Sequence, residues 1–405
     1  MKTKKYYICV TPFFPSTDNW RGAYVYDQVK AIMRNSDYEV VVMKPTSWRD
    51  QTEAYTIDSV QVYLFPTVEM PSYFFNGLTN GTNGRSFLKR LCTLGISLEE
   101  ISVIHTHTGP FACYGLAAKH CCPSIKVLVQ HHDLDPFTIR NGKLAHWKPN
   151  ARYRARKSIE LFNEVDLHVC ISTPVRDSLL AYPHARKEEI FPSYLECLKL
   201  QVGMPSIRPK DTYVLYNGVD LTLFHPQAHR QSSSDLFRIG CIGNFGDIKQ
   251  QLVLIKAVER IIKGGAKDVR LSILGSGPTK QAHVDYVQEH GLAPYVEWPS
   301  EVTHDCLPDY YRSLDLFVLP SIYEGFGCVY LEAAACGVPF ICVEHQGAAE
   351  YIPAEDASRW LMPANDDCRL AEMILAYRRE RYPQRYLYSL DINELVRDFL
   401  SYLKQ

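Results

Sequence analysis

The sequence lacks long apolar runs, and this absence argues against a protein that crosses a membrane. No apolar stretch within its 405 residues approaches the roughly 20 residues that a membrane-spanning helix needs. The start of the chain combines lysines with apolar residues, but the apolar part ends at Thr11 and Pro12 and is too short for a secretory signal. We therefore interpret residues 6–10 as a first strand and expect a cytoplasmic protein.

Paired cysteines are missing as well. The chain has 13 cysteines, but no two of them form a CxxC pair. Most lie within apolar runs, as Cys9, Cys170 and Cys342 do. This pattern predicts reduced, buried thiols, and it argues against a disulfide framework or a structural zinc site.

Net charge is nearly absent, at −1, and no nucleic-acid-binding module is visible, so nucleic acid is not an expected partner. The charge is nevertheless unevenly divided. Residues 1–220 hold 26 basic and 21 acidic residues, whereas residues 221–405 hold 18 and 24. The densest basic window, residues 140–157, has no acidic residue and includes Trp147 and Tyr153. It is consistent with a face for an anionic acceptor or for the inner membrane surface, and equally with a solvated helix face.

Apolar, β-rich runs alternate with helical patterns along the chain, and this alternation predicts an α/β protein with parallel sheets covered on both faces. The predicted strands are residues 6–10, 39–43, 60–65, 103–107, 126–130, 167–171, 213–216, 237–242, 269–274, 295–298, 316–319 and 339–343. Helical patterns include residues 24–33, 249–263 and 371–379. We expect two sheets joined near Asn217-Gly218-Val219-Asp220, with a polar linker at residues 227–235. Ligands of such sheets bind at the carboxyl ends of the strands.

One segment, residues 320–332, combines several signals. Glu324 and Glu332 stand eight positions apart, and a Gly-Phe-Gly turn directly follows Glu324. The apolar run before the segment predicts a buried strand, and the alanines after it predict a helix that stops at Gly337 and Pro339. Glu324 should therefore lie between strand and helix, with Glu332 about five residues into the helix, roughly 7–8 Å further along its axis.

That geometry suits a nucleotide-sugar. The amides that open the helix belong to Phe326, Gly327, Cys328 and Val329. They carry the positive end of the helix dipole and predict a diphosphate site, while Gly325 and Gly327 allow close approach of the backbone. Glu324 can accept hydrogen bonds from a sugar and Glu332 from a ribose. The alternative is a strand–turn–helix with two solvated glutamates, and the complete segment favours the nucleotide-sugar.

With these motifs together, the chain resembles a retaining glycosyltransferase of family 4, which has the GT-B fold. The resemblance covers nearly all of the chain and is strongest over residues 239–352. The acidic motif of the family corresponds to Glu324 and Glu332. The other matching positions are Gly22, Gln130-His131-His132-Asp133, Asn217-Gly218-Val219-Asp220, Gly243, Asn244, Lys249, Gly275, Gly277, Gly347 and Glu350.

The resemblance implies two Rossmann-like, doubly wound domains that face a central cleft. Residues 1–218 would bind the acceptor, residues 219–382 the nucleotide-sugar, and residues 383–405 would form a helix that crosses back to the first domain. The implied reaction moves a sugar, with retention, from a UDP- or GDP-sugar to a saccharide or lipid-linked saccharide in cell-surface polysaccharide biosynthesis. No cofactor, metal or protein nucleophile is implied.

Residue roles also follow from the resemblance. Lys249, Glu324 and His132 would be catalytic: Lys249 would neutralise the diphosphate, Glu324 would hold the sugar, and His132 would lie near the sugar or the acceptor. The implied donor-binding residues are Gly22, Gly243, Asn244, Gly275, Gly277, Val302, Gly325, Phe326, Gly327, Cys328, Val329 and Glu332. The chain departs from the family at three positions: Asn244 replaces a common arginine, whereas Gln250 and Arg21 stand where glycine is usual.

Several alternatives stay open. Asp133-Leu134-Asp135 matches a metal motif of a different glycosyltransferase fold, and the histidines at 105, 107, 131 and 132 resemble a metal cluster, although we expect neither to bind metal. Because neighbours on a strand point to opposite faces, only His131 or His132 should face the cleft, and we favour His132. The alternative functions are a sugar-nucleotide epimerase or phosphorylase of the same architecture, or a non-catalytic nucleotide-sugar-binding subunit.

Overall fold

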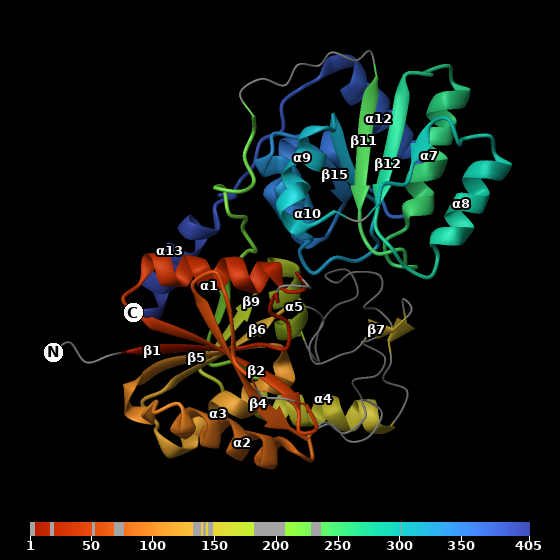
Figure 1. Ribbon diagram of the computed structural model, residues 1–405. Coiled ribbons are helices and arrows are strands. Elements are labelled where there is room, and N and C mark those ends of the chain that lie inside the picture. Colours follow the sequence, from red (N-terminus) through yellow and green to blue (C-terminus); the bar gives the residue numbers. More distant parts are fainter. Residues whose placement is uncertain are drawn as a thin grey trace. The chain divides into compact units, whose positions relative to one another are not determined.

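The computed structural model divides the chain into two compact units, Met1–Asn217 with Ile392–Gln405, and Gly218–Asp391 (Figure 1). It describes residues 5–16, 20–50, 53–68, 77–132, 139–140, 143–144, 149–181, 207–227, 236–300 and 302–405. Most of the expected linker, the DxD motif and part of the basic window lie outside these residues. In the part of the chain that the structure describes, the helices fall short of what a membrane crossing needs in length and apolar character.

The first unit is built on an eight-stranded sheet in the order β10-β9-β6-β5-β1-β2-β4-β3. Its strands are β1 (Tyr6–Val10), β2 (Glu39–Ser47), β3 (Tyr55–Ile57), β4 (Val60–Thr67), β5 (Ile101–His107), β6 (Lys126–His131), β9 (Leu167–Cys170) and β10 (Thr212–Val214). Its longer helices are α1 (Ala23–Asn35), α2 (Asn80–Thr93), α3 (Ala112–Cys121), α4 (Pro149–Phe162), α5 (Thr173–Ala181) and α13 (Ile392–Leu403). Helices α1 and α13 lie on one face of the sheet and α2 and α3 on the other (Figure 1).

The centre of this sheet follows directly from its sequence. All five residues of β1 are buried, because the strand is apolar on both faces and is flanked by β2 and β5. The last helix, α13, contributes Val396, Phe399 and Leu400 to the core that β1 and α1 form. The first unit therefore includes the end of the chain in its core.

The second unit has a six-stranded, wholly parallel sheet in the order β13-β12-β11-β14-β15-β16. Its strands are β11 (Phe237–Ile242), β12 (Val269–Leu274), β13 (Val296–Glu297), β14 (Leu316–Leu319), β15 (Phe340–Val343) and β16 (Leu361–Met362). Its helices include α7 (Gln251–Lys263), α8 (Lys280–Glu289), α9 (Leu307–Arg312), α10 (Cys328–Ala335), α11 (Ala357–Trp360) and α12 (Asp367–Glu380). Helix α7 packs against α12, and α9 packs against α10.

The prediction of parallel sheets is wrong at one edge. Strand β3 pairs with β4 in antiparallel fashion, through a two-residue turn in which Asp58 has φ 48°. A left-handed aspartate in so short a loop is typical of a β-hairpin, and the sequence interpretation overlooked it. It also overlooked β16 and the small hairpin of β7 (Ile139–Arg140) and β8 (Lys143–Leu144).

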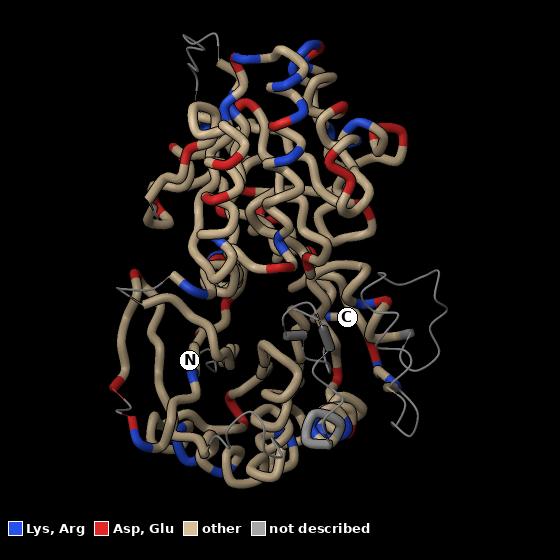
Figure 2. Tube along the Cα trace, turned by 90° about the vertical axis from the view of Figure 1, so that its right-hand side faces the viewer, with Lys and Arg blue, Asp and Glu red and all other residues tan. Residues whose placement is uncertain are grey.

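Along the backbone trace of the second unit, Lys and Arg positions are interspersed with Asp and Glu positions (Figure 2). In the first unit, the described part of the basic window lies on β7, β8 and α4. On α4, Lys157 forms an ion pair with Glu160 one turn later. Such a pair is typical of a solvated helix face. Contact of this window with a membrane surface therefore stays a prediction.

Candidate functional site

Three loops at the carboxyl ends of β11, β12 and β14 are held together by backbone hydrogen bonds. The Gly243 N–H donates to the Leu274 carbonyl at 3.1 Å, and the Phe245 N–H donates to the Ser276 carbonyl at 2.8 Å. The Ile322 N–H donates to the carbonyl of Ile248 at 2.9 Å. The three loops that carry the sequence motifs of the second unit therefore lie side by side. This is expected, because they follow adjacent strands of a parallel sheet.

Lys249 and Glu324 form an ion pair within these loops. The Lys249 Nζ contacts Glu324 Oε1, and the two side chains are 27% and 12% exposed. Gly243 lies beside the pair, because a Cβ at that position would be 3.7 Å from Lys249 Cδ. Two residues predicted to be catalytic therefore meet in a setting that is only partly open to water.

The glycines at 275 and 277 have a structural explanation. Their φ angles are +148° and +150°, and an added Cβ would lie 2.2 Å from the Gly243 oxygen and 2.3 Å from the Phe245 oxygen, respectively. Glycine is required here because the loop lies against the neighbouring loop. Any contact of Gly275 and Gly277 with a donor stays a prediction.

Helix α10 begins as the sequence predicts, after Gly327, which has φ 84°. Glu332 is its fifth residue and accepts a hydrogen bond from Tyr311 Oη at 2.7 Å. Burial raises the pKa of the Glu332 carboxyl to about 7, although the Tyr311 hydrogen bond opposes the shift. Tyr311 is fully buried, so the carboxylate is held by a donor anchored in the core.

The other predicted donor-binding residues differ in exposure. The Phe326 side chain is 1% exposed and its ring lies 5.8 Å from that of Tyr351, so only its backbone is available to a ligand. Asn244 is exposed, and its carbonyl accepts a hydrogen bond from Gln251 Nε2 at 3.0 Å. Val302 is also exposed and follows β13 at the edge of the sheet. The structure gives Cys328 and Val329 the first two positions of α10 and places Gly325 in the turn before it.

Sequence reasoning missed three buried polar residues that support this site. Gln251 is fully buried and bonds to the loop that carries Asn244. Gln346 is 1% exposed and donates to the carbonyl of Ser321, and Tyr311 holds Glu332. A glutamine next to a predicted site loop is a weak signal, because most glutamines are solvated.

In the first unit, the Gly22 turn and His132 lie near each other. Gly22 precedes α1 with φ +93°, and a Cβ there would be 2.5 Å from the Phe13 oxygen. The ring of Tyr24, the second residue of α1, lies 5.0 Å from the ring of His132. His132 Nε2 is 2.9 Å from His107 Nδ1.

The two adjacent histidines point in different directions, as strand alternation predicts. His131 is 1% exposed, and its Nε2 lies 2.9 Å from His168 Nδ1. His132 remains partly exposed. His105 and His107 are buried, and burial lowers the pKa of His105 to about 3 and that of His107 well below its usual value.

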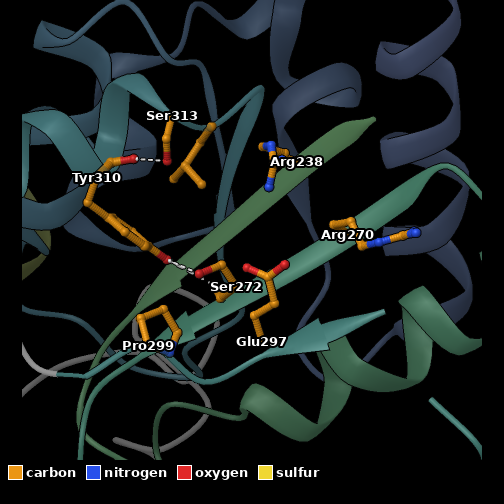
Figure 3. A pocket seen from close by; sticks show the side chains of 8 residues that line it. Arg238, Arg270, Ser272, Glu297, Pro299, Tyr310 and Ser313 are labelled. Atoms are coloured by element: carbon orange, nitrogen blue, oxygen red, sulfur yellow. Dashed lines mark hydrogen bonds between the residues drawn. The ribbon is translucent and has the colours of Figure 1, made fainter. Parts of the chain in front are cut away.

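Among the described residues, no group of three or more His, Cys, Asp or Glu is arranged to hold a metal ion. A separate cavity of about 180 Å³ lies in the second unit, and Figure 3 shows the side chains around it. It is lined by Arg238, Arg270, Ser272, Glu297, Pro299, Tyr310, Ser313 and Leu314. Arg238 and Arg270 are near the amino ends of their strands, so the cavity does not coincide with the site at the carboxyl ends.

Two family models match this chain. Residues 22–192 match the model described as Glycosyltransferase Family 4, and residues 237–379 match the model described as Glycosyl transferases group 1. A putative colanic acid biosynthesis glycosyltransferase of Escherichia coli, WcaL, is 30% identical over 166 residues, which cover 40% of each chain. A GDP-mannose-dependent alpha-(1-6)-phosphatidylinositol monomannoside mannosyltransferase of Mycolicibacterium smegmatis is 29% identical over 149 residues, 33% of this chain and 39% of the relative. The chain thus aligns with about two fifths of the length of these curated relatives.

Solved structures resemble the whole chain. Sucrose-phosphate synthase from Thermosynechococcus elongatus has a TM-score of 0.67 at 17% identity, covering 98% of this chain and 95% of that one. Anabaena HepE in complex with UDP and glucose has a TM-score of 0.61 at 18% identity, with the same coverage. These similarities confirm the predicted GT-B fold.

Proposed function

The chain belongs to glycosyltransferase family 4, and from that premise we propose that it is a retaining, metal-independent glycosyltransferase. Its donor would be a UDP- or GDP-sugar, and its acceptor a saccharide or lipid-linked saccharide in cell-surface polysaccharide biosynthesis. The relatives support this choice, because one is named for colanic acid biosynthesis and one for GDP-mannose, and HepE was solved with UDP and glucose. The mannosyltransferase relative is named for an alpha linkage, which is the product that retention gives from an α-configured donor.

The observation that carries the proposal is the Lys249–Glu324 ion pair beside the amino end of α10. Negative charge develops on the β-phosphate oxygens as the sugar leaves the nucleotide. A lysine and a helix amino terminus fixed in advance stabilise such charge best, because they need not reorganise during the reaction. Glu324 holds Lys249 in place before the donor arrives and can then accept hydrogen bonds from the sugar hydroxyls.

Glu332 would bind the ribose. Its carboxylate oxygens accept hydrogen bonds, and Tyr311 occupies one of them from the core side. The ribose hydroxyls would then donate to the ionised carboxylate. Gly22 and His132 would supply the contribution of the first domain, near the sugar or the acceptor.

The experiment is a thermal-shift screen of the purified protein with UDP-glucose, GDP-mannose, ADP-glucose and dTDP-glucose. We expect stabilisation by one nucleotide class, because a ligand that binds only the folded state raises the melting temperature. Glu332→Gln, which retains an acceptor for Tyr311, should lose most of the shift. Glu372→Ala, which removes a carboxylate paired with Arg369 outside the site, should retain it.

Turnover is then measured as release of the nucleoside diphosphate, and the anomeric configuration of the product is read by NMR. An inverted product would overturn retention. Binding without turnover would identify a non-catalytic subunit, and no shift with any donor would contradict the donor-site assignment.

A further inference from the structure

A line of neighbouring rings runs from the core of the first unit to His132. The Tyr7 hydroxyl lies 2.6 Å from His105 Nδ1. The ring centroids of His105 and His107 are 4.7 Å apart, and those of His107 and His132 are 5.1 Å apart with 13° between the ring planes. The Tyr24 ring covers the end of the line. His132 is therefore the outermost imidazole of a line of rings that begins with Tyr7 on β1 and His105 on β5.

The contact between His107 and His132 is specific in its atoms. His107 Nδ1 and His132 Nε2 are 2.9 Å apart, so a single proton lies between them. His107 is 2% exposed, and burial keeps it neutral by lowering its pKa well below the usual value. In a neutral imidazole one nitrogen donates and the other accepts, so the shared proton also decides which tautomer His132 adopts.

We propose that His107 is a positioning residue for His132. It fixes the orientation of the His132 ring and the tautomer in which His132 takes part in sugar transfer. The inference rests on the proposed function, because it assigns a purpose to His132. It adds a residue that the sequence analysis considered only as part of a possible metal cluster.

The same sheet provides a matched control. His131 and His168 form a second buried pair, with 2.9 Å between Nε2 and Nδ1, ring centroids 5.2 Å apart and 9° between the ring planes. The His168 Nε2–H donates to the Phe162 carbonyl at 2.9 Å, so this pair ends on the backbone. Removing it should reduce stability as much as removing His107, without altering His132.

The experiment uses the full chain labelled with ¹⁵N-histidine, with His132 resonances assigned by their loss in His132→Gln. We expect one His132 tautomer in the unaltered protein and a mixture of the two in His107→Leu. His107→Asn should restore the single tautomer, because its amide reaches the former position of Nδ1. His168→Leu should leave the His132 resonances unchanged.

Turnover of the donor found in the thermal-shift screen is compared across the same variants. We expect kcat to fall roughly 10- to 100-fold in His107→Leu with KM for the donor little changed, and to recover in His107→Asn. An unchanged tautomer in His107→Leu, or a changed tautomer with unchanged kcat, would overturn the proposal. If the unaltered protein neither binds nor turns over any donor, the proposed function fails and this role fails with it, while the NMR spectra still report whether the pair exists.

Discussion

The two domains hold their polar groups by different physical means. In the second, Lys249 and Glu324 are ionisable groups on loops and are partly open to water, and the carboxylate of Glu332 lies on the second turn of α10. In the first, Tyr7, His105 and His107 are buried on the neighbouring strands β1 and β5, and burial keeps the imidazoles neutral. The second site should therefore respond to salt, pH and charge substitutions, whereas the first should respond to shape and proton placement.

The largest effect on kcat should come from removing the positive charge of Lys249 in the second domain. Lys249→Ala should lower kcat about 1,000-fold, because it deletes a fixed donor to the leaving diphosphate and leaves Glu324 without its partner. Lys263→Ala at the carboxyl end of α7, the helix that follows Lys249, breaks the Lys263–Glu259 ion pair outside the site and should leave kcat unchanged. Nucleoside diphosphate release measures both, and equal rates in the two variants would contradict the role of Lys249.

The first domain can be tested by a neutral substitution. Tyr7→Phe should reduce the free energy of unfolding by about 1–3 kcal/mol, because His105 Nδ1 then lacks its hydroxyl partner in the core. The loss should be the same in low and high salt, since no net charge is involved. Urea denaturation measures it, with Tyr55→Phe as the control for a partly buried hydroxyl that donates to Pro15. If the loss of unfolding free energy in Tyr7→Phe depended strongly on salt, charge would matter in the first domain as it does in the second, and the contrast between the two domains would be wrong.

Donor binding should depend on pH through Glu332. The carboxyl pKa is raised to about 7, and ribose hydroxyls donate to the ionised form, so binding releases a proton and affinity rises with pH. Between pH 6 and pH 8 the ionised fraction, and hence the affinity, should increase about tenfold. Isothermal titration with UDP-glucose or GDP-mannose tests this, because their diphosphates do not titrate in this range. Glu332→Gln should flatten the profile, and a profile equally steep in that variant would exclude Glu332 as the cause.

The smallest expected effect is on stability and concerns Gln250, which stands where the family usually has glycine. Gln250 has φ 51° and ψ 34°, a left-handed conformation that glycine adopts without strain. Gln250→Gly should stabilise the second domain by about 0.5 kcal/mol, since the greater freedom of glycine in the unfolded chain offsets part of the gain. Gln250→Ala retains the strain and should not stabilise. Thermal unfolding of the two variants measures the difference, and equal melting temperatures would show that the strain is negligible.

Most of the fold could be predicted because its strands are apolar runs with clear limits. Residues 6–10 and 237–242 became β1 and β11 with those bounds. The signals around Glu324 and Glu332 are also close together in the sequence. The strand before them, the turn and the helix could therefore be inferred from the order of apolar, glycine and alanine residues. The antiparallel strand β3 was missed because it is only three residues long and depends on one left-handed aspartate.

The partners of the site residues could not be predicted, because they come from distant parts of the chain. Tyr311 on α9 donates a hydrogen bond to Glu332 on α10, and His107 at the end of β5 contacts His132, which follows the neighbouring strand β6. A sequence shows that Phe326 is apolar, but only packing shows that its ring lies in the core against Tyr351. The choice between His131 and His132 likewise depended on which face of β6 meets His168.

The last helix has a consequence for synthesis of the protein. Because α13 supplies Val396, Phe399 and Leu400 to the core around β1, the first domain cannot complete its packing until α13 has left the ribosome. The second domain, residues 218–391, is translated in full before that moment. A premature stop codon before α13 would therefore retain every residue proposed for the reaction, yet would yield a first domain with an open core.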